Sequence, residues 1–311
     1  MPRPCASAWN VSGSVKMKLS EKIFRRRNWL QGLATLATNP HVGNFASGKL
    51  YTGSLKRACV PGLNCYSCPA ATGACPVGAF QAVVGSSSYK FSYYITGILI
   101  LIGVMLGRFV CGFLCPFGWF QDLLHKLPSP KFSTKKLKAL TYLKYIIMIV
   151  VVWWLGVFIV DETGMSMPYF CKYICPQGIL EGALPISLVR PSLRTAFGSL
   201  FNLKLATLIV ITILSIMMYR PFCKWICPLG AFYSLFNKLS FMQLNVSNAC
   251  IGCGKCEKIC PMDVSIYKGE RERECIRCGD CIEACPVDAI SSTWSCFKED
   301  KQNSLKCREG E

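Results

Sequence analysis

The chain has 311 residues, of which 52% are hydrophobic, and its formal net charge is +18. These properties conflict in a soluble globular protein but agree in a membrane protein with basic loops. They do not favour nucleic-acid binding, because the basic residues flank apolar runs instead of forming one patch. The chain is not a small secreted domain, so its 21 cysteines favour metal ligation over a disulfide scaffold.

Residues 1–27 form a polar segment that closes with Arg25, Arg26 and Arg27. Four uncharged segments follow along the chain, at residues 28–48, 91–107, 145–160 and 205–219. The last three are strongly apolar and lie near the short end of the ~17–25 residues that a membrane-spanning helix needs. The first is weaker because it contains Asn39-Pro40-His41, and an amphipathic or re-entrant segment is the alternative there.

The charges of the loops orient these segments. The loop after the second segment carries Lys126, Lys131, Lys135, Lys136 and Lys138, whereas the loop after the third opens with Asp161 and Glu162. By the positive-inside rule, the N-terminus and the lysine-rich loop are cytoplasmic. Each span moves the chain to the other side of the membrane, so the N-terminus and the lysine-rich loop are both cytoplasmic only if residues 28–48 also span. We therefore expect four transmembrane helices with both termini in the cytoplasm.

The motif Cys-Pro-x-Gly occurs four times before residue 240, beginning at Cys75, Cys115, Cys175 and Cys227. A second cysteine precedes the last three copies by four residues, at Cys111, Cys171 and Cys223, and the first copy follows Cys59, Cys65 and Cys68. The copies divide the membrane region into two tandem halves, at residues 25–130 and 138–240. Parallel repeats of this kind are related by an axis along the membrane normal, so equivalent motifs meet at each face.

The inner face is expected to gather Cys111, Cys115, Cys223 and Cys227, whose four thiolates suffice for one iron–sulfur cluster. The outer face is expected to gather Cys171 and Cys175 with some of Cys59, Cys65, Cys68 and Cys75, as a cluster, as disulfides or as redox-active thiols. A C-x3-C pair on one helical turn presents both sulfurs on one face, and the following proline places the second cysteine at a helix end. Buried cysteines that pack as small hydrophobic side chains are the alternative.

Eight cysteines near the C-terminus repeat the pattern C-x2-C-x2-C-x3-C-P, which is typical of bacterial ferredoxins with two [4Fe–4S] clusters. In such proteins the fourth cysteine of each run ligates the other cluster. One predicted cluster therefore uses Cys250, Cys253, Cys256 and Cys285, and the other uses Cys275, Cys278, Cys281 and Cys260. Zinc knuckles also use C-x2-C pairs, but they do not explain a doubled run with proline after each last cysteine.

The predicted fold is an α-helical membrane protein, with four transmembrane helices in two tandem halves, followed by a small α+β two-cluster bacterial ferredoxin domain. Its parts are a cytoplasmic N-terminal segment (1–27), a four-span membrane domain (28–240), a ferredoxin domain (246–292) and a polar tail (293–311). The tail contains Cys296 and Cys307, which fit neither cluster and are expected to be free thiols.

The Cys-x3-Cys-Pro motifs, the four spans and the C-terminal ferredoxin run together resemble the NapH-like family of membrane ferredoxin-type proteins, over about residues 25–290. Members of that family are described as quinol dehydrogenase components, in the cytoplasmic membrane of bacteria or archaea. The resemblance implies electron exchange between membrane quinone or quinol, cytoplasmic clusters and a partner redox protein. The extra cysteines at Cys59, Cys65 and Cys68 and the Cys171–Cys175 pair depart from the two-motif pattern of the family.

The sequence therefore predicts a membrane-bound electron-transfer protein with two [4Fe–4S] clusters in its ferredoxin domain and one or two more in its membrane domain. The expected partners are membrane lipid, quinone or quinol and a redox protein, without nucleic acid. The alternative is a membrane metal-ion or thiol–disulfide reductase, or an assembly factor, that uses Cys171 and Cys175. No P-loop or dinucleotide fingerprint is present.

Overall fold

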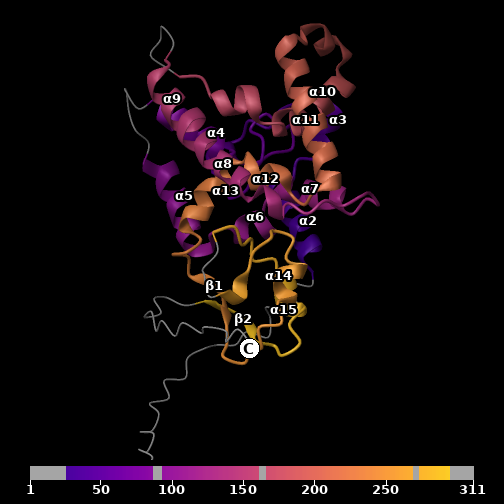
Figure 1. Ribbon diagram of the computed structural model, residues 1–311. Coiled ribbons are helices and arrows are strands. Elements are labelled where there is room, and N and C mark those ends of the chain that lie inside the picture. Colours follow the sequence, from indigo (N-terminus) through magenta and orange to yellow (C-terminus); the bar gives the residue numbers. More distant parts are fainter. Residues whose placement is uncertain (1–25, 87–92, 161–165, 269–272, 295–311) are drawn as a thin grey trace, which may run out of the picture.

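Helices make up most of the structure, and a small two-stranded sheet follows them (Figure 1). The computed structural model describes residues 26–86, 93–160, 166–268 and 273–294. The first half contains α2 (Arg27–Thr38), α3 (Gly43–Ser47), η1 (Ser54–Arg57), α4 (Pro76–Gly85), α5 (Tyr93–Leu106), α6 (Phe109–Phe113) and α7 (Pro116–His125). The second half contains η2 (Lys135–Tyr142), α8 (Leu143–Ile146), η3 (Ile147–Trp154), α9 (Leu155–Phe158), η4 (Phe170–Ile174), η5 (Ile179–Ala183), α10 (Leu184–Val189), η6 (Pro191–Ala196), α11 (Ser199–Met217), α12 (Pro221–Trp225) and α13 (Pro228–Phe236). The C-terminal part contains β1 (Met242–Val246), α14 (Lys255–Ile259), η7 (Ile266–Lys268), α15 (Asp280–Glu283) and β2 (Ile290–Trp294).

The third and fourth predicted spans coincide with two long apolar helices, except for the last two residues of each span. These helices are Leu137–Phe158, with 22 residues, and Ser199–Met217, with 19 residues, and both are long and apolar enough to cross a membrane. Only 22% and 17% of their most apolar stretches are buried inside the protein. Most of this apolar surface therefore faces outward, which is unlike the core helix of a soluble protein.

The first two predicted spans are not continuous spanning helices in the described residues. The segment 28–48 breaks at Asn39, before Pro40, into α2 with 12 residues and α3 with 5 residues. A 12-residue helix is about 18 Å long, whereas the hydrocarbon core is about 30 Å thick, so a single spanning helix over 28–48 is not confirmed. The segment 91–107 forms the apolar helix α5, which has 14 residues; residues 91 and 92 lie outside the described residues.

Proline begins the helix that follows three of the four Cys-Pro motifs. Cys75, Cys115 and Cys227 each precede such a proline and have extended backbone angles as the N-cap residues of α4, α7 and α13. The prediction that the second cysteine lies at a helix end is confirmed. The prediction that a C-x3-C pair shares one helical turn is wrong for Cys111, because its helix α6 ends at Phe113, before Cys115.

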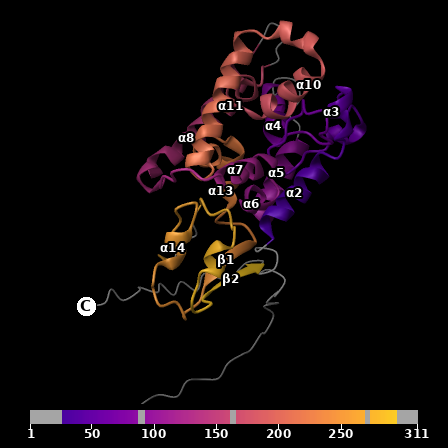
Figure 2. The ribbon, with the colours of Figure 1, turned by 90° about the vertical axis from the view of Figure 1, so that its right-hand side faces the viewer.

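The C-terminal part repeats one backbone pattern in each of its two cysteine runs. Strands β1 and β2 pair antiparallel, with Met242 opposite Trp294 and Val246 opposite Ile290, and α14 packs against α15. Three pairs of equivalent positions have positive φ: Gly252 and Arg277, Gly254 and Gly279, and Asp263 and Asp288. The sheet and the two runs form one body, the ferredoxin module, which lies at one end of the helical part in both ribbon views (Figures 1 and 2).

A buried ion-pair network joins the ferredoxin module to the helical part. The Glu274 carboxylate pairs with the fully buried side chains of Arg108 and Lys144, and the Lys144 ammonium lies 2.5 Å from Glu274 Oε2. Burial alone would raise the pKa of Glu274, but the two cations outweigh it and hold the pKa below its ordinary value. The carboxylate therefore stays ionised at the interface between the ferredoxin module and the helical part, which we call the seam.

Arg277 is a second connection across the seam and is only 3% exposed. Its guanidinium donates to the Leu106 carbonyl oxygen at 2.7 Å, where α5 ends, and to the Asn237 carbonyl oxygen at 2.9 Å. A cation at a helix C-terminus satisfies carbonyl groups that have no partner within the helix. Asp263 of the ferredoxin module likewise pairs with Lys224 of α12 at 3.0 Å.

We expect the Glu274→Gln variant to loosen the docking of the ferredoxin module. The substitution leaves Arg108 and Lys144 buried without a counter-charge, and because the carboxylate is partly exposed we expect a loss of about 1–3 kcal/mol in the free energy of unfolding. Hydrogen exchange of the seam amides would measure the loosening. Asp280→Asn is the control, since the Asp280 side chain is 41% exposed and its contact with Arg27 is long, at 3.8 Å. Equal exchange in both variants would contradict the expectation.

Candidate metal centres

Four cysteines of the ferredoxin module surround one small cavity. Cys250, Cys253, Cys256 and Cys285 line it together with apolar groups from β1 and β2, namely Val246 and Ile290. This set combines the first three cysteines of one run with the last cysteine of the other. The Ala289 amide nitrogen lies 3.3 Å from Cys285 Sγ and donates a hydrogen bond to it.

The other four cysteines of the module form a more buried set, Cys260, Cys275, Cys278 and Cys281. Burial raises the pKa of Cys281, and the neighbouring Cys275 and Cys260 thiolates raise it further. Backbone amides of Val264 and Arg277 donate to the sulfurs of Cys260 and Cys275, each at 3.4 Å. This second ferredoxin set faces the helical part, because Glu274 and Arg277 flank its cysteines in the seam.

The predicted inner-face cysteines come together at the end of the helical part that meets the ferredoxin module. We call Cys111, Cys115, Cys223 and Cys227 the proximal set; each is at most 6% exposed. Burial raises the pKa of Cys227, and the nearby Cys223, Cys111 and Cys115 thiolates raise it further. Four mutually close, buried thiols favour their neutral form unless a metal shares their charge.

Two fully buried arginines cross between the halves beside the proximal set. Arg108 and Arg220 each stand three residues before the first cysteine of a pair. The Arg220 guanidinium donates to the Cys111 carbonyl oxygen at 2.6 Å, and Arg108 donates to the Cys223 carbonyl oxygen at 3.4 Å. An arginine from each half thus binds the backbone of a proximal-set cysteine in the other half. The two guanidiniums also bring positive charge next to four thiols.

Asp122 balances part of that charge. Arg220 binds it through two hydrogen bonds, with Nε 2.7 Å from Oδ1 and Nη2 2.5 Å from Oδ2, and Arg27 adds a contact at 3.3 Å. Burial alone would raise the pKa of Asp122, but the facing guanidiniums outweigh it and keep the pKa below its ordinary value.

A second set of cysteines lines a cavity of about 740 Å³ farther from the ferredoxin module. We call Cys65, Cys75, Cys171 and Cys175 the distal set; it contains four of the six predicted outer-face cysteines. Ala71 stands four residues before Cys75, where the other motifs have their first cysteine, and Cys65 from the preceding loop supplies the fourth thiol. Cys59 and Cys68 do not line this cavity. The backbone of Cys59 pairs with that of Ala74 in an isolated parallel β-bridge, and Cys68 packs with Ala70 and Ala71.

The proximal and distal sets have matching glutamines. Gln121 donates from Nε2 to Cys223 Sγ at 3.1 Å and accepts from the Phe222 amide. Gln81 donates from Nε2 to Cys171 Sγ at 3.2 Å and accepts from the Phe170 amide. Both glutamines lie six residues after a Cys-Pro cysteine, so the two sets are built by one repeated plan.

One loop touches both sets. The backbone of Leu63 lies near the thiol of Cys115, and the backbone of Asn64 lies near the thiol of Cys75, so each partly offsets the rise that burial causes in the pKa of that thiol. The loop fits closely at Gly62, where an added Cβ would lie 2.9 Å from Cys115 Cα. Tyr233 fixes it by donating to the Pro61 carbonyl oxygen at 2.9 Å. Two consecutive residues of this loop therefore lie near one thiol of each set.

The proximal set also meets the second ferredoxin set through close backbone packing. Gly112 follows Cys111, and Ile276 follows Cys275. A Cβ added at Gly112 would lie only 2.5 Å from the Ile276 carbonyl oxygen, so only glycine fits there. Arg108 is electrostatically coupled to Cys111, Cys223 and Glu274, the last of which precedes Cys275.

The donor groups of these sets are cysteine thiols, and several of them accept hydrogen bonds from N–H groups. Among the described residues, no three His, Cys, Asp or Glu side chains are close enough to hold one metal ion, and no cysteine there forms a disulfide. A four-iron cage is wider than one ion, so its thiolates lie farther apart. Amide and glutamine N–H groups directed at the sulfurs are the usual partners of cluster sulfur.

Sequence reasoning missed several residues that shape these sites. The arginines three residues before Cys111 and Cys223 were visible as a repeat. The position six residues after each Cys-Pro cysteine is polar in all four copies, as Gln81, Gln121, Glu181 and Tyr233. The first two bind a cysteine sulfur, whereas Glu181 accepts from the Cys65 amide at 2.9 Å and Tyr233 binds Pro61.

Two sequence families match the chain. A 4Fe-4S binding domain family matches residues 73–93, 90–135, 145–184 and 204–245, and a 4Fe-4S dicluster domain family matches residues 242–286. The first family thus covers the Cys-Pro motifs of the helical part, and the second covers the ferredoxin runs. No solved structure matches the chain.

Curated relatives are similar to the chain over about half of its length or more. Uncharacterized protein MJ0750 of Methanocaldococcus jannaschii is 31% identical over 57% of this chain and 68% of its own length. The methylamine utilization ferredoxin-type protein MauN of Paracoccus denitrificans is 26% identical over 63% of this chain and 60% of its own. The putative electron transport protein YccM of Escherichia coli is 26% identical over 54% of this chain, which spans only 45% of that relative. The chain therefore belongs to the 4Fe-4S ferredoxin-type family, together with the M. jannaschii relative.

Proposed function

We propose that the chain is a membrane electron conduit, in which electrons pass between the two ferredoxin sets, the proximal set and the distal set. The observation that carries this proposal is the continuous row of cysteine sets. Gly112 and Ile276 join the second ferredoxin set to the proximal set, and Leu63 and Asn64 join the proximal set to the distal set. When bound, [4Fe–4S] clusters supply one-electron redox chemistry at each set.

Membrane insertion is supported by the outward apolar faces of the Leu137–Phe158 and Ser199–Met217 helices and by the charge of +18. We propose a multi-pass protein with its ferredoxin module and both termini in the cytoplasm. Arg27, at the start of α2, contacts Asp280 of the ferredoxin module, so the beginning of the helical part and the module lie on the same side. The lysine-rich loop lies there too, because Thr134 binds Asp263.

Membrane quinone or quinol is the exchange partner that we propose within the bilayer. An apolar groove of about 410 Å³ lies between Pro76, which follows Cys75, and Pro228, which follows Cys227. Phe80, Trp153 and Phe232 line it, and flat aromatic side chains suit a quinone ring. A quinone there would lie between the distal and proximal sets. A partner redox protein then exchanges electrons with the ferredoxin module.

The alternative of a reductase that uses Cys171 and Cys175 as free thiols is less well supported. Reactive cysteines are partly exposed and have lowered pKa values. Burial raises the pKa of Cys171 to about 11 and raises the pKa of Cys175 further, so neither is a thiolate at neutral pH without a metal. One relative is named a putative electron transport protein, which agrees with the conduit.

Iron and acid-labile sulfide, measured on anaerobically purified protein, test the proposal. Four occupied sets give about sixteen irons per chain, and Cys111→Ser/Cys223→Ser is expected to lower that number by about four. Cys59→Ser/Cys68→Ser is the matched control, since these buried or half-buried cysteines belong to no set and should leave the count unchanged. About eight irons, the same in all three proteins, would confine the clusters to the ferredoxin module and contradict the proposed conduit.

A further inference from the structure

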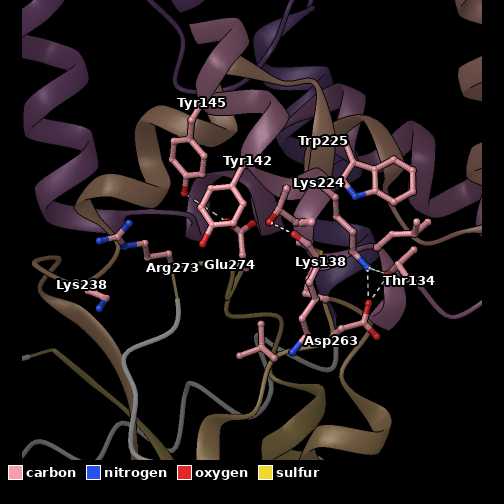
Figure 3. Close-up of a pocket in the computed structure, with 15 residues that line it drawn as sticks. Thr134, Lys138, Tyr142, Tyr145, Lys224, Trp225, Lys238, Asp263, Arg273 and Glu274 are labelled. Carbon is pink, nitrogen blue, oxygen red and sulfur yellow. Dashed lines mark hydrogen bonds and ion pairs between the residues drawn. The ribbon is translucent and has the colours of Figure 1, made fainter. Parts of the chain in front are cut away.

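A cavity of about 580 Å³ lies in the seam between the helical part and the ferredoxin module, outside all four cysteine sets. Figure 3 shows its walls, with Tyr142, Tyr145 and Lys138 from η2 and α8 on one side and Arg273, Glu274 and Asp263 from the ferredoxin module on the other. Its volume is within the usual range for small-molecule sites, about 300–1,000 Å³. The cavity is therefore large enough for a small ligand that touches both parts of the protein.

The uncompensated charge of this cavity is positive. Four cations line it, Lys138, Lys224, Lys238 and Arg273, against two acids, Glu274 and Asp263. Both acids are already engaged, Glu274 by two buried cations and Asp263 by Lys224 and Thr134. Lys138 and Arg273 form no ion pair with any residue that the structure describes. An anion that enters the cavity would find these two cations available.

The two cations come from different parts of the protein. Lys138 lies on η2, which leads into the long Leu137–Phe158 helix, and Arg273 precedes Glu274 in the ferredoxin module. Phosphate groups have several anionic oxygens, so one phosphate can accept hydrogen bonds from a guanidinium and an ammonium at once. Tyr142, which is 68% exposed, and Trp225 add aromatic surface beside the cations.

We propose that this seam cavity binds a phosphate ester, whose anionic group is attracted by Lys138 and Arg273. The bound phosphate joins the two parts of the chain, beside Met262 and Glu274, which lie within two residues of Cys260 and Cys275. A headgroup of an anionic phospholipid and a soluble phosphate ester share this chemistry. The site does not depend on electron transfer, so it stands or falls separately from the conduit.

Isothermal titration calorimetry on the full chain, loaded with clusters in a phosphate-free non-ionic detergent, tests the site. The probes are inorganic phosphate, flavin mononucleotide with riboflavin as its phosphate-free partner, and short-chain phosphatidylglycerol with phosphatidylcholine, which is zwitterionic and has no net charge, as its partner. We expect at least one phosphate-bearing anionic probe to bind, and Lys138→Gln/Arg273→Gln to weaken that binding at least about tenfold. Tight binding by phosphatidylglycerol alone assigns a lipid headgroup, and tight binding by flavin mononucleotide assigns a soluble ester.

Lys135→Gln is the matched control, because Lys135 is an exposed cation on the same helix η2 and does not line the cavity. It should change the affinity less than about twofold if the site is specific. Equal weakening by Lys135→Gln and by the double variant would overturn the proposal, since it would show a general charge effect. Binding of none of the anionic probes, or equal binding of flavin mononucleotide and riboflavin, would overturn it as well. Unchanged iron content in every variant keeps these outcomes distinct from a failure to assemble.

Discussion

Replacing Arg220 with methionine is expected to lower the free energy of unfolding by about 3–5 kcal/mol, because it leaves the buried Asp122 carboxylate with only the longer contact to Arg27, at 3.3 Å. Arg220 is fully buried, and Asp122 is 4% exposed. Methionine fills much of the same volume, so a cavity contributes little to the loss. The variant also loses the bond to the Cys111 carbonyl oxygen, and the proximal set should assemble poorly.

Denaturant unfolding, followed by cluster absorbance and by far-ultraviolet circular dichroism, measures both effects. The double variant Arg220→Met/Asp122→Asn also removes the negative charge of Asp122, and it should recover most of the free energy of unfolding that Arg220→Met loses. Arg190→Met is the control for loss of a surface arginine, since Arg190 is exposed and its guanidinium donates to the Ser47 carbonyl oxygen at 3.5 Å. A single Arg220→Met variant as stable as Arg190→Met would show that the Asp122 pair contributes nothing.

The Gly112→Ala variant is expected to slow electron transfer between the ferredoxin module and the helical part several-fold while all cysteines stay in place. The added Cβ would lie 2.5 Å from the Ile276 carbonyl oxygen, and because that atom is backbone, the ferredoxin module must move away. Electron transfer weakens steeply with separation, so a small displacement between the second ferredoxin set and the proximal set has a large effect on the rate.

Stopped-flow reoxidation of the dithionite-reduced protein by a quinone analogue measures that rate. Gly97→Ala is the matched control, because Gly97 lies in α5 and nothing is within 4 Å of an added Cβ there. Iron content should be the same in both variants. Equal reoxidation rates in Gly112→Ala and Gly97→Ala would mean that electrons do not cross the seam at this contact.

The sequence was most informative where ligands are close together in the chain. The ferredoxin runs and the Cys-Pro motifs depend on spacings of two to six residues and on the fixed φ of proline, which act locally. The grouping of Cys111 and Cys115 with Cys223 and Cys227 followed from the tandem repeat, and the structure places these four thiols together. Assignment of individual cysteines to clusters stays a prediction.

Long-range choices could not be predicted in this way. Nothing in the spacing of Cys59, Cys65 and Cys68 shows which one joins the distal set, because the choice depends on how the loop passes between the halves. The crossing of Arg108 and Arg220 is equally non-local, although their matched positions before Cys111 and Cys223 were visible. In the segment 28–48, the lack of charge did not reveal the break at Asn39, before Pro40, into two short helices.

The interlocked halves have a consequence for the order in which the protein matures. A ribosome completes the ferredoxin runs within one short stretch, residues 250–285, whereas Cys111 and Cys115 must wait for Cys223 and Cys227. Cys65 and Cys75 wait in the same way for Cys171 and Cys175. Until translation has passed residue 175, the distal set has only half of its cysteines, and the proximal set stays half complete until residue 227. In the proposed conduit, metal loading of the helical part is therefore a late event, and the nascent protein needs protection from oxidation for most of its synthesis.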